Sequence, residues 1–298
     1  MKHIKVVTAI LLLLFSNKST ASPQSPDLLI YNGDTTAVYT LLLELYFDRI
    51  KKNVDNDGQL FGLKFREGAT LNCWRGYQAI YKIENDSLFL VHITRCDEYY
   101  LAGSIDSNES KRRIEEIFGA KVKDGKVLIN WYSGSLGIPK NEKKILRWDG
   151  VFYTIYEEEI QIKINKGRVL KISEIENYID KPDRINRRYQ DTVSNVIFAE
   201  IQKIKWGYND KLDCSERYWI TIGKSGNITS VKMVEYQTKS EIKEYWTRRE
   251  YNYCIRKLKK GLKDLRFDVI RKMGRPIAED IYIEIWFEDD GTIENWTN

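Results

Sequence analysis

The chain has 298 residues, which is enough for one large domain or two domains of ordinary size. Apolar residues make up 42% and charged residues 31%, so the composition is globular and excludes disordered and collagen-like classes. The formal net charge is +5 and only two histidines are present, which disfavours metal binding or catalysis that depends on histidine.

Residues 1–21 have the pattern of a secretory signal peptide. Two lysines precede an apolar run at 6–15, and small residues end the segment, so we expect cleavage near Ala21. As a helix the run would span about 15 Å, half of a bilayer core, which argues against a permanent anchor. We therefore predict a bacterial periplasmic or secreted protein. Cleavage would remove three lysines and no acid, which lowers the net charge to +2, so nucleic-acid binding is not expected.

Residues 27–180 are predicted to form a mostly antiparallel β domain. β-branched and aromatic residues gather in short runs between turn signals such as Glu84–Ser87. A helix is expected at 110–118 with Gly119 as its stop, and the segment 173–176 has the capping-box spacing that would begin a second short helix. The expected strands are 69–73, 77–83, 88–94, 127–132, 145–148, 151–164 and 169–172.

Residues 181–191 are polar and contain a proline, so we predict a linker there, followed by a second domain at 192–298. Thr238 and Glu241 have capping-box spacing at the start of what reads as one long helix. The predicted elements of this domain are a helix at 193–204, a hairpin of strands 218–222 and 228–236, the long helix to about residue 263, and a last strand at 281–287.

The four cysteines outside the signal favour disulfide bonds in an exported protein. We expect the pairs Cys73–Cys96 and Cys214–Cys254, because each pair then stays within one predicted domain. The sequence lacks Cys-x-x-Cys and a phosphate-binding glycine loop, so we predict neither a metal site nor a cofactor.

The second domain resembles the C-terminal domain of TonB-type energy transducers. The stretches that carry the resemblance are WITIGKSGNITSVKMVEY (219–236) and FDVIRKMGRPIAEDIYIEIWF (267–287). The resemblance implies an α+β fold of hairpin, helix and strand that binds extended peptides along a sheet edge. A transducer also has a membrane helix and a long proline-rich spacer, whereas this chain has five scattered prolines and a folded β domain instead. The resemblance therefore implies a binding module and not an energy-coupling machine.

The first domain resembles an uncharacterised domain of exported and other bacterial proteins. The matching stretches are LNCWRGYQAIYKIENDSLFLVHI (71–93) and INWYSGSLGIP (129–139). This resemblance implies no activity.

Two surfaces are predicted to meet a partner. The first is the last strand, as an accessible sheet edge formed by Ile281, Tyr282, Ile283, Glu284, Ile285, Trp286 and Phe287. The second is the basic side of the long helix, which would suit an acidic protein or an anionic membrane surface and is formed by Arg248, Arg249, Arg256, Lys257, Lys259, Lys260 and Lys263.

Residues that could carry catalysis each have a simpler structural interpretation. Glu157 and Glu159 share a strand face and could form a carboxylate pair, although edge charge explains them as well. His92 lies in an alternating strand, where it is expected to hydrogen-bond a neighbour. Tryptophans such as Trp74 and Trp131 suit sugar stacking, but also a β core or an interface.

The sequence therefore predicts a soluble periplasmic protein without catalytic activity that binds an unidentified protein partner in the cell envelope. Two alternatives from other classes stay open. One is an exported immunity protein that neutralises an interbacterial toxin. The other is an envelope hydrolase that uses Glu157 and Glu159.

Overall fold

Two compact units make up the chain in a computed structural model, which describes residues 23–50, 59–60, 63–64, 70–96, 105–140, 144–206, 213–236 and 238–297. The predicted signal lies outside these residues. The first unit comprises Met1–Leu136, Arg147–Thr154 and Ile162–Ile172, and the second comprises Gly137–Leu146, Ile155–Gln161 and Ser173–Asn298. This division differs from the predicted boundaries, because it passes through three strands of one sheet. Strand residues outnumber helical residues, which confirms a mixed α+β class with mostly sheet.

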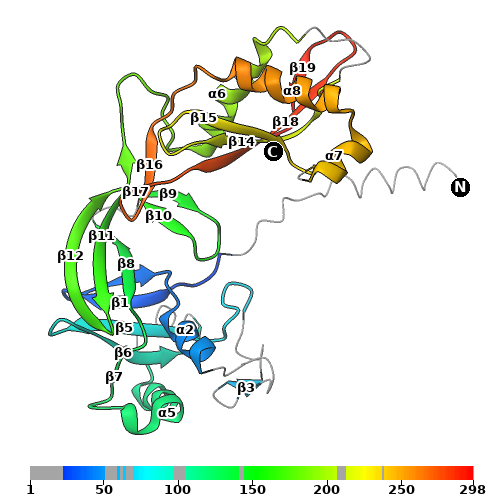
Figure 1. Cartoon of the computed structure of the whole chain (residues 1–298). Helices are drawn as coiled ribbons and strands as arrows, with labels where there is room; N and C mark the ends of the chain where they lie inside the picture. Colours follow the sequence, from blue (N-terminus) through cyan, green and yellow to red (C-terminus); the bar gives the residue numbers. More distant parts are fainter. Residues whose placement is uncertain are drawn as a thin grey trace, which may run out of the picture. The chain divides into compact units, whose positions relative to one another are not determined.

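The largest sheet, most of whose residues belong to the first unit, has the strand order β2-β1-β5-β6-β12-β11-β8, with β7 also paired to β6 (Figure 1). The strands are β1 (Asp27–Tyr31), β2 (Asp34–Val38), β5 (Gln78–Glu84), β6 (Ser87–Thr94), β7 (Val127–Leu128), β8 (Gly134–Pro139), β11 (Glu158–Asn165) and β12 (Arg168–Glu176). Pairing is antiparallel from β5 to β6 and from β6 to β12, but β1 pairs with β5 in parallel. Two-stranded pieces are formed by β3 (Gln59–Leu60) with β4 (Leu63–Lys64), and by β9 (Ile145–Trp148) with β10 (Thr154–Tyr156).

Helices α2 (Leu42–Arg49) and α5 (Ser107–Phe118) belong to the first unit. Asp106 caps α5 by accepting hydrogen bonds from two backbone N–H groups, and Gly119 ends it with a positive φ of 51°. A short 3₁₀ turn, η1 (Gly119–Lys121), follows. His92 in β6 lies 3.2 Å from the buried Ser110 hydroxyl of α5, which also accepts a hydrogen bond from the Ile93 N–H. The expected hydrogen bond of His92 to a neighbour is thus confirmed, and it joins α5 to the sheet.

The second unit contains a four-stranded antiparallel sheet in the order β15-β14-β18-β19. Its strands are β14 (Glu216–Ile222), β15 (Ile228–Met233), β18 (Glu279–Phe287) and β19 (Ile293–Asn295). Helices α6 (Gln190–Gln202) and α8 (Arg248–Gly261) pack on one face of this sheet (Figure 1). Alternation along each strand places Tyr218, Ile220, Ile281 and Ile283 in the core between sheet and helices. The predicted hairpin and last strand are therefore present.

The predicted long helix is two helices, α7 (Lys239–Tyr245) and α8. Thr238 and Glu241 form the predicted capping box, and Thr247 and Glu250 form a second one two residues after α7 ends. The second box satisfies N–H groups that a continuous helix would have bonded internally, so the break at Trp246 is stabilised locally.

Further predictions differ from the structure. Where the expected strand 69–73 is described, it is a turn closed by a bridge between Thr70 and Cys73, and the expected strand 151–164 is divided between β10 and β11. Residues 173–176 belong to strand β12 and not to a helix. The capping box there would begin a helix of only a few residues, which is weaker than pairing in the sheet. Residues 181–191 contribute buried structure to the second unit. Ile185 forms a bridge with Phe267, and Arg187 is fully buried. A second sheet of this unit joins β13 (Tyr178–Ile179), β16 (Val269–Lys272) and β17 (Arg275–Pro276).

Both expected disulfides, Cys73–Cys96 and Cys214–Cys254, are present. The second bond ties α8 to the chain just before β14. Two disulfides fit a protein that is exported to an oxidising compartment. Among the described residues, no helix has the length and apolar character needed to cross a membrane.

Candidate functional site

Strand β18 divides the predicted edge site between two faces of the sheet. Ile281, Ile283 and Ile285 point into the core and are at most 4% exposed, so they cannot contact a partner while the unit is folded. Phe287 packs beside them. The residues between them, including Tyr282 and Trp286, point to the opposite face, which α6 and α8 do not cover.

The uncovered face carries a group of aromatic side chains. Trp219 of β14 meets Tyr282 across the strands with ring centroids 5.5 Å apart, and Trp286 meets Trp296 at 5.6 Å. Trp286 and Trp296 are 36% and 52% exposed. We call Trp219, Tyr282, Glu284, Trp286 and Trp296 the open sheet face. Tryptophan and tyrosine at such a position are the residue types that dominate binding energy at protein interfaces.

Glu284 holds the aromatic side chains of the open sheet face in position. One carboxylate oxygen accepts a hydrogen bond from the Tyr282 hydroxyl at 2.5 Å, and the other accepts from the Trp286 indole N–H at 3.0 Å. Partial burial and this carboxylate raise the pKa of Tyr282 to about 12, so the hydroxyl remains a donor at neutral pH. The rings are thus oriented before any partner arrives.

The free edge of β18 is shorter than predicted, because β19 pairs with its end from Ile285 to Phe287. The Glu284 N–H donates to the Thr297 hydroxyl, and the Glu284 carbonyl accepts from the Trp296 N–H. The backbone N–H groups of alternate residues point to the same edge of a strand, so the Tyr282 N–H, like that of Glu284, points away from β14. Tyr282 lies outside the part of β18 that β19 covers. Along β18, an added peptide strand would therefore find a free edge only in the part before Glu284, around Tyr282.

The predicted basic surface lies on the exposed side of α8 and just beyond it. At 100° per residue, five of the six cations within α8 fall within about 120° of the helix circumference, opposite Cys254 and Leu258 in the core. Lys257 lies outside this arc, and its ammonium group donates to the Lys205 carbonyl. The other cations of the predicted surface are Arg248, Arg249, Arg256, Lys259 and Lys260 on the arc, and Lys263 just beyond the helix. Among the described residues only Lys263 of this set has an ion pair, with Asp264 at 3.9 Å.

Glu157 and Glu159 meet different partners and do not act as a pair in this structure. The Glu157 carboxylate accepts hydrogen bonds from Arg188 at 2.9 and 3.2 Å. Glu159 is buried, and one of its oxygens accepts from the Tyr156 N–H at 3.1 Å. Its other oxygen has no hydrogen-bond partner among the described residues. Burial raises the pKa of Glu159 above its usual value. The nearby Asn177 and Lys272 lower this pKa, but by less.

We predict that Glu159→Gln raises stability at neutral pH relative to the wild type. Because the pKa of Glu159 is higher in the folded state, the folded protein keeps this proton in a pH range in which the unfolded chain has already lost it. The free energy of unfolding therefore falls as the pH rises above about 4.5. Glutamine removes this loss, so the variant should gain on the order of 1 kcal/mol at pH 8 and nothing at pH 4. Urea unfolding at both pH values measures the difference. Glu158→Gln, on the exposed side of the same strand, is the control; an effect of Glu159→Gln that is equal at both pH values would contradict the prediction.

A buried polar network in the first unit was not found from the sequence. Asp27 accepts hydrogen bonds from Arg75 at 3.1 Å and from the Tyr81 hydroxyl at 3.0 Å. Glu44 of α2 accepts one from the Tyr77 hydroxyl. Asp27 and Tyr81 are at most 1% exposed, so this network joins β1, β5 and α2 out of reach of a substrate.

Comparison with protein-family models, curated proteins and solved structures finds no match to this chain. Both family resemblances therefore stay predictions. The sequence pointed to Trp219 only as one of the tryptophans that suit sugar stacking, an interface or a β core, and it did not single out Trp296. The alternation of Trp219 with the apolar Tyr218 and Ile220 was the signal available for the first of these two residues.

Proposed function

We propose that the protein is an exported, non-catalytic binding module that binds a protein partner of the cell envelope through the open sheet face. The observation that carries this proposal is the cluster of oriented aromatic side chains on the sheet face opposite α6 and α8. The order of hairpin, helix and strand is the one that the TonB-like resemblance implies, and the two disulfides suit an oxidising compartment.

The open sheet face supports binding better than edge addition does. Only a short part of β18 is free for main-chain pairing, whereas Trp286 and Trp296 together present a large apolar area. Such residues are typical hot spots, each worth about 2 kcal/mol or more. The free edge at Tyr282 borders this face, so a partner segment could use both.

The test is affinity capture from an envelope extract with the intact protein as bait. We expect the double variant Trp286→Ala/Trp296→Ala to retain its partner at least thirtyfold more weakly, because the loss of even one hot spot of about 2 kcal/mol has that effect. The matched control is Trp74→Ala in the first unit, because Trp74 is as exposed as Trp296, at 52%. Thermal melting of each variant establishes that it is folded.

The basic face of α8 gives the experiment a second arm. Arg256→Gln/Lys260→Gln removes two cations that have no ion pair among the described residues. If this variant loses the partner while the tryptophan variant keeps it, the open sheet face is the wrong site. The proposal would also be contradicted if no protein partner is captured and the protein instead binds anionic vesicles through these cations.

A further inference from the structure

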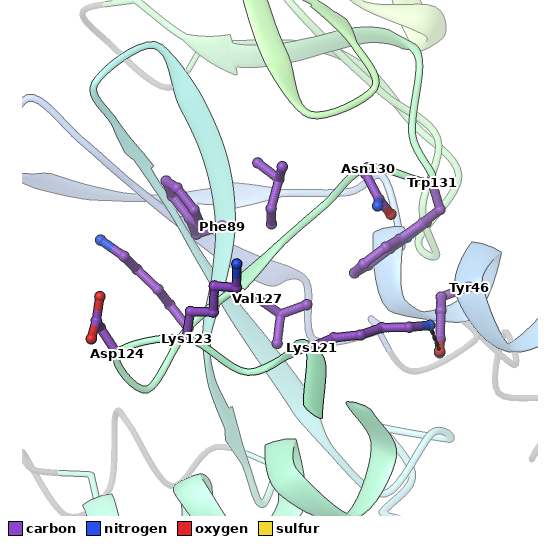
Figure 2. A pocket seen from close by; sticks show the side chains of 10 residues that line it. Tyr46, Phe89, Lys121, Lys123, Asp124, Val127, Asn130 and Trp131 are labelled. Carbon is purple, nitrogen blue, oxygen red and sulfur yellow. Dashed lines mark hydrogen bonds between the residues drawn. The ribbon is translucent and has the colours of Figure 1, made fainter. Parts of the chain in front are cut away.

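A pocket of about 400 Å³ lies in the first unit between α2, β6 and the chain around β7 (Figure 2). Aromatic rings and lysines make up most of its lining, and Asp124 is the one acidic residue that lines it. We call it the lysine–aromatic pocket, defined by Tyr46, Phe89, Trp131, Lys121, Lys123 and Lys126. This volume lies in the range of small-molecule sites.

The aromatic wall is rigid. Trp131 donates its indole N–H to the Leu42 carbonyl at 2.9 Å, and its ring stacks on Phe118 at 5.4 Å. Tyr46 packs against the same ring at 4.8 Å. Figure 2 shows Phe89 and Trp131 at opposite sides of the pocket, with Val127 between them. The pocket thus offers apolar ring surfaces without any need for rearrangement.

The lysines give the pocket a positive potential. Lys126 pairs with Glu84 and lies 4.7 Å from the centroid of the Phe89 ring. The Lys121 ammonium group lies 3.4 Å from the Tyr46 hydroxyl, and the structure records no carboxylate partner for it or for Lys123 among the described residues. The Lys121 ammonium group therefore lies beside the Tyr46 ring, and neither Lys121 nor Lys123 has an ion pair among the described residues, so both are available to a negatively charged group.

We propose that the lysine–aromatic pocket binds a small organic anion that contains a ring. Its carboxylate or phosphate would meet Lys121, on the side of Tyr46, or Lys123, on the opposite side, and its ring would pack against Trp131 or Phe89. Sugar acids and aromatic acids share this chemistry, because the C–H face of a sugar and an aromatic ring both pack on indole. This ligand site is separate from the protein-binding face proposed for the second unit.

The test is calorimetric titration of the intact protein with four probes: glucuronate, benzoate, glucose and inorganic phosphate. We expect glucuronate, benzoate or both to bind with a Kd on the order of 1 mM, as suits ligands of this size. Lys121→Gln/Lys123→Gln should weaken binding about fivefold or more, and added salt should weaken it further. The control is Lys171→Gln, an exposed lysine of β12 in the same unit that does not line the pocket.

Each outcome decides the proposal. Binding of glucuronate alone identifies sugar acids as the ligand class, and binding of benzoate alone identifies aromatic acids. If neither binds, or if the double lysine variant binds as well as the wild type, the pocket is not an anion site. If glucose binds as tightly as glucuronate, the negative charge has no role in binding. If inorganic phosphate binds as tightly as the ring-containing anions, the ring has no role. Either result overturns the proposal.

Discussion

Replacing Glu279 with glutamine is expected to lower the free energy of unfolding by about 3–5 kcal/mol, because it removes the negative charge that faces a buried guanidinium. Two nitrogens of Arg187 lie 3.0 Å from the same carboxylate oxygen of Glu279. The Arg187 side chain is fully buried, and its backbone N–H donates to the Tyr178 hydroxyl. Urea unfolding with both proteins at neutral pH measures the loss.

The matched variant replaces both charges, as Arg187→Met/Glu279→Leu. Removing the pair together removes the cost of burying charge, so this double variant should be clearly more stable than Glu279→Gln. A loss below about 1 kcal/mol for Glu279→Gln, or a double variant that is no more stable, would show that the ion pair does not secure this part of the unit.

Gly226→Ala is expected to destabilise the protein by about 3 kcal/mol or more, from backbone strain and a direct collision. Gly226 lies in the turn between β14 and β15 with a φ of +86°, where L side chains are strained. A Cβ there would lie only 2.0 Å from the Phe267 carbonyl oxygen. The Phe267 N–H also donates to the Gly226 carbonyl, so the collision disrupts a bonded backbone contact.

Gly291→Ala separates the two causes of this loss. Gly291 has a similar φ of +80°, but a Cβ there would have no neighbour within 4 Å. We expect a cost of about 1 kcal/mol from strain alone. Thermal or urea unfolding of both variants tests the comparison. Equal losses would mean that strain, and not the approach of Phe267, sets the requirement for glycine at Gly226.

The candidate sites were only partly predictable. The sequence singled out β18 as a binding strand. Which of its residues face solvent, and that β19 covers its end, depend on how β18 pairs with its neighbours in the sheet. The sequence also singled out the cations of α8, whose common arc follows from helical spacing alone. The lysine–aromatic pocket was not predictable, since Tyr46 and Trp131 are far apart in the chain and meet only through packing.

The sequence by itself determined the features that depend on near neighbours. Residue spacing accounts for the hairpin before α7, the capping box at Thr238 and the apolar stripe of α8. The turn residues of the hairpin specify it locally, whatever it packs against. The two disulfides followed from assigning each cysteine to one half of the chain.

Tertiary structure decided the features that depend on distant partners. A parallel pairing of β1 with β5 cannot be read from either strand, because both directions use the same alternation. Residues 181–191 are polar and read as a linker, yet Arg187 is buried because Glu279, far along the chain, supplies the opposite charge. Burial of a charge depends on which group lies opposite it, and only the folded chain brings that group into place.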